Sequence, residues 1–198
     1  LAGAFASSHY LQVTSGANAG VSVAIAGNDV TTLTTEQDIS SLLVGDESYV
    51  IRAYTTLADV FGSANEAGIG SGANSTDADE LLIYNGTGFD IYYYQEGAPF
   101  GGEGWRASVN AFTDASATPL PYGAALIIKR KQDADVFVVV SGSVLATDSF
   151  VPVENGVNWV SGANPIEYTL ASYFGTDGGS LLSGPNSSEA DEILVPKD

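Results

Sequence analysis

The sequence has no cysteine and no methionine, and it has one histidine in 198 residues. The lack of thiols excludes disulfides and thiolate metal sites. A single imidazole also leaves zinc and iron without their usual ligands. A Ser-His-Asp site would have to use His9, and no G-x-S-x-G motif occurs. The 24 acidic residues include many pairs, but nothing singles out two for glycoside hydrolysis. We therefore predict a protein that is not an enzyme and requires no cofactor.

Basic residues are also scarce. The chain has 6 Lys and Arg against 24 Asp and Glu, which gives a formal net charge of −18. Nucleic acids and anionic lipids bind basic surfaces, so neither is expected as a partner. No run of 18 apolar residues is present, and no membrane span is expected.

Several features predict a location outside the cell or at its surface. The chain does not start with Met, which predicts a processed protein or a piece of a longer one. Residues 1–6 (LAGAFA) are small and apolar, as around signal-peptidase sites. The absence of both oxidisable sulfur residues suits an extracellular protein.

Short β-branched and aromatic runs separated by turns dominate what is present. Asn85-Gly86 between apolar runs predicts a hairpin joining 81–84 to 89–95. Helical turns are expected at 38–43, with Asp38 as N-cap, and at 56–61, between a Thr56 cap and Gly62. Further strands are expected at 10–14, 21–25, 30–35, 49–54, 105–109, 124–130, 136–145, 151–153, 158–160 and 192–195. The predicted class is all-β, a sandwich or partly open barrel with one or two short helical turns.

An internal repeat organises the chain. Residues 56–83 recur in altered form at 169–195, with an offset of 113 and then 112 residues. The first copy continues into further strands, whereas the second stops three residues after Val195. We predict that residues 1–145 form an N-terminal module plus the complete first repeat unit. Residues 146–198 are predicted to form a truncated second repeat unit, packed on the first as one body and with an open sheet edge.

Most of the chain also resembles a known family. The resemblance rests on LQVTSG in residues 11–16, NGTGF in 85–89, YYYQ in 92–95, GWR in 104–106 and PLP in 119–121. It is to an uncharacterised family of secreted bacterial β-rich proteins with multiple paralogues and no assigned activity. The resemblance implies export and a β fold, and it supplies no catalytic residues. In that family the second repeat usually continues into its own aromatic strand.

Three sets of side chains are candidate ligand sites. Clustered carboxylates before a strand are candidate calcium ligands, or otherwise turn-forming residues: Asp77, Asp79, Glu80, Glu189, Asp191 and Glu192. Tyr92, Tyr94 and Trp105 are expected in the core or an interface, and alternatively form a platform that stacks on glycans. Asn74, Asn85 and Asn186 match N-glycosylation acceptors.

These observations favour a structural subunit that joins copies of itself into an extracellular filament or surface layer. The edge at Glu192, Ile193, Leu194 and Val195 would accept a strand from the next copy, such as the arm 1–14 with Tyr10, Leu11 and Val13. The basic run Lys129, Arg130 and Lys131 would meet an acidic patch of a neighbour, or else protect an edge strand. The alternative is a cell-surface carbohydrate-binding or adhesion module that uses the aromatic platform.

Overall fold

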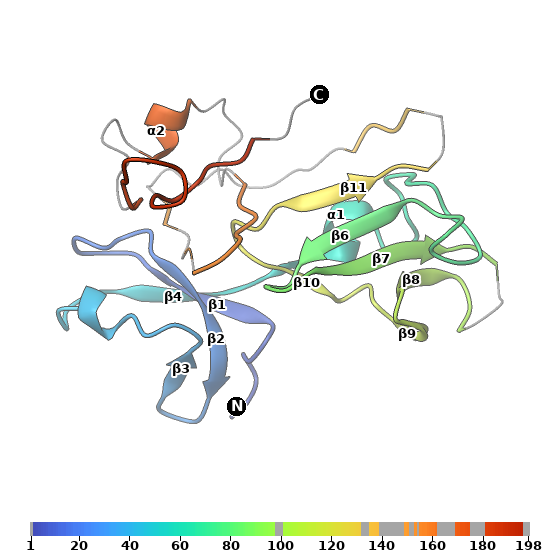
Figure 1. Ribbon diagram of the computed structural model, residues 1–198. Helices are drawn as coiled ribbons and strands as arrows, with labels where there is room; N and C mark the ends of the chain where they lie inside the picture. Colours follow the sequence, from blue (N-terminus) through green and yellow to red (C-terminus); the bar gives the residue numbers. More distant parts are fainter. Residues whose placement is uncertain are drawn as a thin grey trace. The chain divides into compact units, whose positions relative to one another are not determined.

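The computed structural model describes residues 2–97, 101–131, 135–138, 149–150, 153, 155–161, 169–174 and 181–195. Its contacts divide the chain into two units, Leu1–Ala163 and Asn164–Asp198. The boundary predicted at 145/146 falls among residues 139–148, outside the described part. Strands dominate the described residues, with two short α-helices (Figure 1). The sheets are antiparallel and do not close into a barrel, which confirms the all-β class and is consistent with a sandwich.

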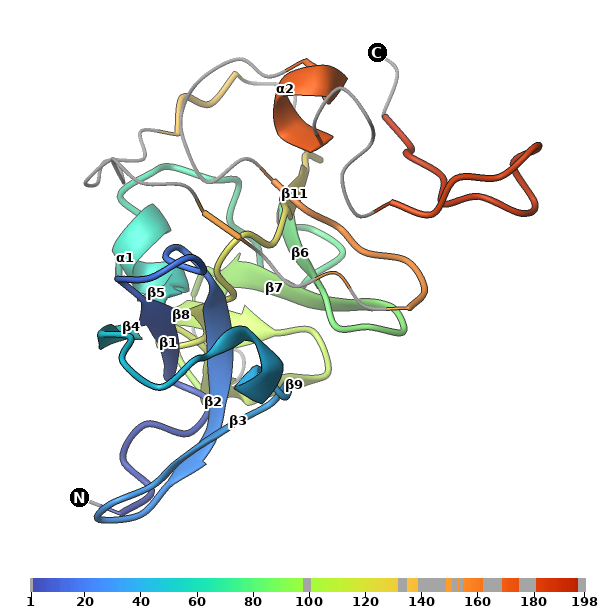
Figure 2. The same ribbon diagram turned by 90° about the vertical axis from the view of Figure 1, so that its left-hand side faces the viewer.

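The first sheet has the strand order β3-β2-β1-β4. Its strands are β1 (His9–Val13), β2 (Ser22–Asn28), β3 (Leu33–Thr35) and β4 (Tyr49–Ala53). Figure 2 shows β1 between β2 and β4. Alternating side chains of β1 and β2 fill one core, in which Leu11, Val13, Val23 and Ile25 are buried together with Val21 and Ile39. The alternation predicted from the sequence produces this core because successive side chains of a strand point to opposite faces.

The first expected helical turn forms as a short 3-10 helix, Ser40–Leu42. Its N-cap is Ile39, so the prediction of Asp38 at that position is wrong. The Asp38 carboxylate instead accepts a hydrogen bond from the Ser40 amide at 2.9 Å. An Asp two residues before an amide makes such a turn without being the cap residue.

The second sheet has the order β11-β6-β7-β8-β9. Its strands are β6 (Glu80–Tyr84), β7 (Phe89–Gln95), β8 (Gly104–Ala107), β9 (Asn110–Asp114) and β11 (Leu126–Lys129). The predicted hairpin joins β6 to β7, and the Asn85 side-chain oxygen accepts from the amides of Thr87 and Gly88. Gly86 has φ 91°, the left-handed region that Gly adopts without steric cost.

Helix α1 (Leu57–Phe61) packs its buried side chains on this sheet. Leu57 and Phe61 share a core with Leu81, Tyr94 and Trp105. The helix begins with a capping box, in which Thr56 accepts from the Asp59 amide and Asp59 accepts from the Thr56 amide. The predicted Thr56 cap and the end of the helix at Gly62 are therefore confirmed.

Other expected strands differ from the structure. Strands β9 and β10 (Pro119–Leu120) were not predicted; β10 pairs with the short β5 (Thr55–Thr56). Residues 136–138, 153, 158–159 and 192–195 are described and are not in strands, while 139–145 and 151–152 lie outside the described part. In the second unit the repeat forms helix α2 (Leu170–Phe174) as the counterpart of α1.

Candidate functional site

The repeated acidic segment forms a tight loop that leads into β6 in the first unit. The Asp79 carboxylate accepts from the Gly70 amide at 2.8 Å, and the Asp79 amide donates to the Gly70 carbonyl at 2.8 Å. Within the loop, the Asn74 side-chain oxygen accepts from the Thr76 amide at 2.9 Å. Gly72 allows the loop to close, since a Cβ there would lie 2.8 Å from the Ala78 nitrogen. The loop thus fixes Asp79 and Glu80 at the start of β6.

The basic end of β11 closes this loop. Arg130 Nε lies 2.6 Å from Asp79 Oδ2, and the Lys131 amide donates to Asp79 Oδ1 at 2.7 Å. Lys129 and Lys131 place their ammonium groups 3.0 and 2.7 Å from the two Glu80 oxygens. Successive side chains of an extended segment point to opposite faces, so Lys129 and Lys131 lie on one face and reach Glu80, while Arg130 lies on the other and reaches Asp79. Three of the 6 basic residues of the chain therefore form ion pairs with Asp79 and Glu80.

Opposing effects act on the Glu80 carboxyl. Burial raises its pKa, but the hydrogen bonds and charges of Lys131 and Lys129 outweigh burial, so the pKa lies below its usual value. Glu80 is thus ionised in the folded protein, and its ion pairs help to hold β11 on β6. This stabilisation is present above the pKa of Glu in the unfolded chain and is lost as the pH falls through the lower folded value.

The second unit forms the same loop and repeats the hydrogen bonds described above. The Asp191 carboxylate accepts from the Leu182 amide at 2.8 Å, and the Asp191 amide donates to the Leu182 carbonyl at 3.0 Å. The Asn186 side-chain oxygen accepts from the Ser188 amide at 3.0 Å. A Cβ on Gly184 would lie 2.5 Å from the Glu189 carbonyl oxygen, so Gly is needed here as at Gly72. Figure 2 shows the arms of this loop, residues 181–195, running side by side.

The segment after this second loop differs sharply from β6. Ile193, Leu194 and Val195 are 41%, 82% and 67% exposed. Leu81 and Ile83, the counterparts of Ile193 and Val195, are 0% and 7% exposed, and Leu82, the counterpart of Leu194, is partly buried. Among the described residues, no strand pairs with 192–195, and neither Asp191 nor Glu192 forms an ion pair. Within the part of the chain that the structure describes, the second unit therefore presents the acidic pair and the apolar segment without a counterpart of β11, the strand that pairs with β6 in the first unit.

Two predicted interface groups make their contacts within the chain itself. Tyr10, Leu11 and Val13 are at most 9% exposed and lie in β1, which is hydrogen-bonded on both edges. The prediction that this arm is donated to a neighbour is wrong, because β1 is central in its own sheet. The Lys129–Lys131 patch is likewise engaged within the chain by Asp79 and Glu80.

The predicted stacking platform does not form. Trp105 and Tyr94 are 0% and 5% exposed and pack edge to face, with ring centroids 5.3 Å apart. Tyr92 packs against the same core, so the three rings do share a face, as alternation requires. The Trp105 indole donates to the Gly62 carbonyl at 2.7 Å, which ties β8 to the end of α1. These aromatics serve the core and offer no flat surface to a sugar.

The calcium candidates are spread over separate contacts. Asp79 and Glu80 have cationic partners, while Asp77 accepts a hydrogen bond from the Asn74 amide group at 2.7 Å. Asn186 makes the same contact with Glu189 at 2.8 Å. Within the described residues, no three His, Cys, Asp or Glu side chains lie close enough to hold a metal ion. Calcium binding by Glu189, Asp191 and Glu192 remains a prediction.

The three N-glycosylation candidates, Asn74, Asn85 and Asn186, are exposed in turns. In each, the side-chain oxygen accepts from the amide two residues later. Their use as acceptors remains a prediction.

Sequence reasoning named the acidic and the basic residues separately and did not join them. The signal was present, because three adjacent cations in a chain with only 6 must lie near carboxylates. The partner could not be chosen from the sequence, since 24 acidic residues were available.

Comparisons with known proteins give no relative. No protein-family model, curated protein or solved structure matches this chain. The family resemblance of the sequence therefore stays a prediction. Among the described residues there is also no helix with the length and hydropathy needed to cross a membrane.

Proposed function

We propose that this protein is a structural subunit that joins copies of itself by strand addition, outside the cell or on its surface. The observation that carries the proposal is the exposed second motif: segment 192–195 repeats the sequence of residues 80–83 in β6, which lies between β7 and β11 in the first unit, and no described strand pairs with segment 192–195. The occupant is the edge strand β11 of a second copy. Charge complementarity favours this strand, because the Lys129 side chain at its end is 60% exposed while it pairs with Glu80, and its exposed side can face Glu192 of another copy.

We take the register of the proposed contact from the pairing of β6 with β11 in the first unit. Strands β6 and β11 are antiparallel, with Glu80 opposite Lys129 and Leu81 opposite Ile128. The 112-residue offset transfers these pairs to Glu192 opposite Lys129 and Ile193 opposite Ile128. Among the described residues, no strand pairs with β11 on the side away from β6, and residues 123–125 are joined by hydrogen bonds and a β-bridge to residues 159–161. Residues 126–129 of a second copy therefore offer the outer edge.

The energies of burial and association predict a weak contact between two copies. Such a contact stabilises an assembly only when it is repeated along a fibre. Full burial of two aliphatic side chains, Ile193 and Val195 by analogy with Leu81 and Ile83, contributes about 1.5–3 kcal/mol each, against an association cost of at least about 4 kcal/mol. Backbone hydrogen bonds fix the register and add modestly. Because the two surfaces differ, the contact is head-to-tail and extends into a fibre unless the rotation closes a ring.

Cysteine cross-linking tests the proposed register, and the absence of native cysteine makes the test specific. The double variant Ile128→Cys with Ile193→Cys places one thiol on each proposed surface. Mild oxidation should give a reducible ladder of oligomers on a denaturing gel. A double variant with Val109→Cys in place of Ile128→Cys is the matched control, because Val109 is 92% exposed and lies outside β11. Monomers cross-linked within one chain, or equal ladders in both variants, contradict the proposal.

Sedimentation velocity over a concentration series, with electron microscopy of the same samples, tests the association itself. Leu194→Lys should abolish the concentration dependence, since it places a charge in the apolar contact. Leu182→Lys is the control, because Leu182 is 64% exposed in the same loop but outside the strand sequence. A wild-type protein that stays monomeric at high concentration would overturn the proposal.

A further inference from the structure

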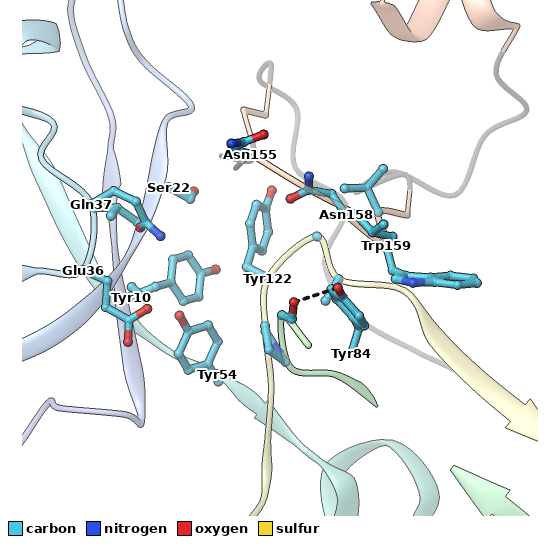
Figure 3. A pocket seen from close by; sticks show the side chains of 18 residues that line it. Tyr10, Ser22, Glu36, Gln37, Tyr54, Tyr84, Tyr122, Asn155, Asn158 and Trp159 are labelled. Atoms are coloured by element: carbon cyan, nitrogen blue, oxygen red, sulfur yellow. Dashed lines mark hydrogen bonds between the residues drawn. The ribbon is translucent and has the colours of Figure 1, made fainter. Parts of the chain in front are cut away.

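A cleft of about 340 Å³ opens in the first unit, beside the loop that joins β10 to β11. Four tyrosines and a tryptophan contribute to its lining: Tyr10, Tyr54, Tyr84, Tyr122 and Trp159. They come from β1, from the residue after β4, from the β6–β7 hairpin, from the β10–β11 loop and from segment 155–160 (Figure 3). The volume lies within the range of small-molecule sites, roughly 300–1,000 Å³.

Contacts among the rings hold the cleft in shape. Tyr122 stacks on Tyr10 with centroids 5.1 Å apart and an interplanar angle of 21°, and Tyr54 lies 5.2 Å from Tyr10. Figure 3 shows Tyr122 between these two rings on one side and Tyr84 on the other. The Tyr122 hydroxyl lies 2.9 Å from Ser149 Oγ, at hydrogen-bonding distance, and the Tyr84 hydroxyl donates to the Gly86 carbonyl at 2.8 Å. The aromatic walls are therefore positioned before a ligand arrives.

Amide and hydroxyl groups surround these rings. Gln37, Asn155 and Asn158 line the cleft with Ser22, and each can both donate and accept hydrogen bonds. Burial raises the pKa of Tyr54 to about 12, with a smaller contribution from the Glu36 charge, so its hydroxyl stays protonated near neutral pH. The cleft combines apolar ring faces with neutral groups of both hydrogen-bonding senses.

The charges at the cleft and on the whole chain limit the class of ligand that the cleft can bind. Glu36 is the one charged residue among the described residues that line the cleft, and no Lys or Arg is among them. The net charge of −18 adds to the repulsion of anions. Phosphorylated ligands and uronic acids are therefore disfavoured. Neutral sugars fit, because their C–H faces pack on aromatic rings and their hydroxyls pair with amides and a carboxylate.

From this geometry we infer that the cleft of Tyr54, Tyr84, Tyr122 and Trp159 binds a neutral saccharide. The inference does not depend on strand addition, because the cleft lies away from segment 192–195 in the sequence and uses none of its residues. It also uses none of the aromatics that the sequence suggested for a glycan platform.

Tryptophan fluorescence gives a direct assay, because the chain has two tryptophans. Trp105 is fully buried, whereas Trp159 is 37% exposed and lines the cleft. We would titrate the full chain with xyloglucan, galactomannan, dextran and hydroxyethylcellulose, using polygalacturonate and choline as charged probes. A saturable change with a neutral polysaccharide that is lost in Trp159→Phe is the expected result. Binding of choline or polygalacturonate alone would overturn the assignment.

Affinity electrophoresis in gels containing the same polysaccharides tests the lining residues. Tyr122→Ala should weaken retardation roughly tenfold through loss of the ring surface. Asn158→Ala removes a polar group with little change in packing and should also weaken binding, which keeps the test decisive if the first variant is unstable. Tyr49→Ala is the control, since Tyr49 is 58% exposed on the edge strand β4 and lies outside the cleft. If no neutral polysaccharide retards the protein, or if all variants are retarded equally, the cleft is not a saccharide site.

Discussion

Asp79 and Asp191 occupy equivalent positions in the two copies of the motif. Each carboxylate accepts a hydrogen bond of 2.8 Å from the backbone amide nine residues before it. Their surroundings differ, because Asp79 is 1% exposed beneath Arg130 and Asp191 is exposed. The loop thus forms from local hydrogen bonds whether or not a strand covers it. Local sequence builds the motif, and tertiary pairing determines whether its strand is buried.

This difference predicts unequal costs for the same substitution. Asp79→Asn leaves the partly buried Arg130 without its counterion and should lower the free energy of unfolding by about 3 kcal/mol. Asp191→Asn removes an exposed charge and should cost less than about 1 kcal/mol. Urea denaturation followed by circular dichroism measures both values. Equal costs at the two positions would contradict the assigned role of the β11 cations.

The capping box of α1 gives a second stability prediction. Thr56→Ala removes the acceptor for the Asp59 amide and should destabilise the first unit by about 1 kcal/mol. Thr56→Ser keeps the hydroxyl and serves as the control. Thermal unfolding should separate the two variants by a few degrees, and coincident transitions would show that the cap contributes nothing.

Local patterns predicted the fold wherever the chemistry was itself local. The Asn85-Gly86 hairpin and the Thr56 cap were found because each depends on residues within a few positions. The β8–β9 turn was missed, since Val109 lies in an exposed turn although its sequence continues an apolar run. Composition alone could not distinguish such a turn from a strand.

The candidate sites were harder to predict because they depend on contacts distant in sequence. Tyr92 and Tyr94 were correctly placed on one face, but whether that face is open depends on α1, which covers it. The tyrosine cleft escaped notice because Tyr10 and Tyr122 come from segments more than a hundred residues apart. A sheet order is needed before such a pair can be recognised.

Alkaline pH should destabilise the first unit through Tyr54. Burial raises its pKa to about 12, above the unfolded value near 10, so the folded state holds the proton more tightly. This contribution is complete below about pH 10 and is lost as the pH rises toward 12. Urea unfolding between pH 8 and 12, with tyrosinate absorbance, should show the decline.

The same titration needs a variant to assign it, because burial also raises the pKa of Tyr10 and Tyr92. Tyr54→Phe should reduce the pH dependence of stability above pH 10. If the stability of Tyr54→Phe declines with pH as steeply as that of the wild type, the ionisation of a group other than Tyr54 causes the decline.

Charge exchange offers the strictest test of strand addition. In the proposed register Glu192 of one copy faces Lys129 of the next, so Glu192→Lys and Lys129→Glu each place like charges opposite one another. Lys129→Glu also removes the ion pair of Lys129 with Glu80 in its own chain, so circular dichroism must first show that this variant is folded. Each variant alone should associate roughly 2- to 5-fold more weakly than the wild type. An equimolar mixture of the two variants should associate as strongly as the wild type. In a fibre in which the two variants alternate, every contact between residues 192 and 129 joins opposite charges. Light scattering of the two variants and their mixture, at one total concentration, measures this.

The mixture also separates the specific contact from general repulsion. Glu192→Lys lowers the net negative charge of −18 and Lys129→Glu raises it, so charge alone predicts opposite effects on association. The register predicts that both variants weaken it and that mixing restores it. Glu189→Lys is the control, because Glu189 is exposed in the same loop and precedes the strand sequence. Association that follows net charge alone, with no recovery on mixing, would exclude the pairing of Glu192 with Lys129.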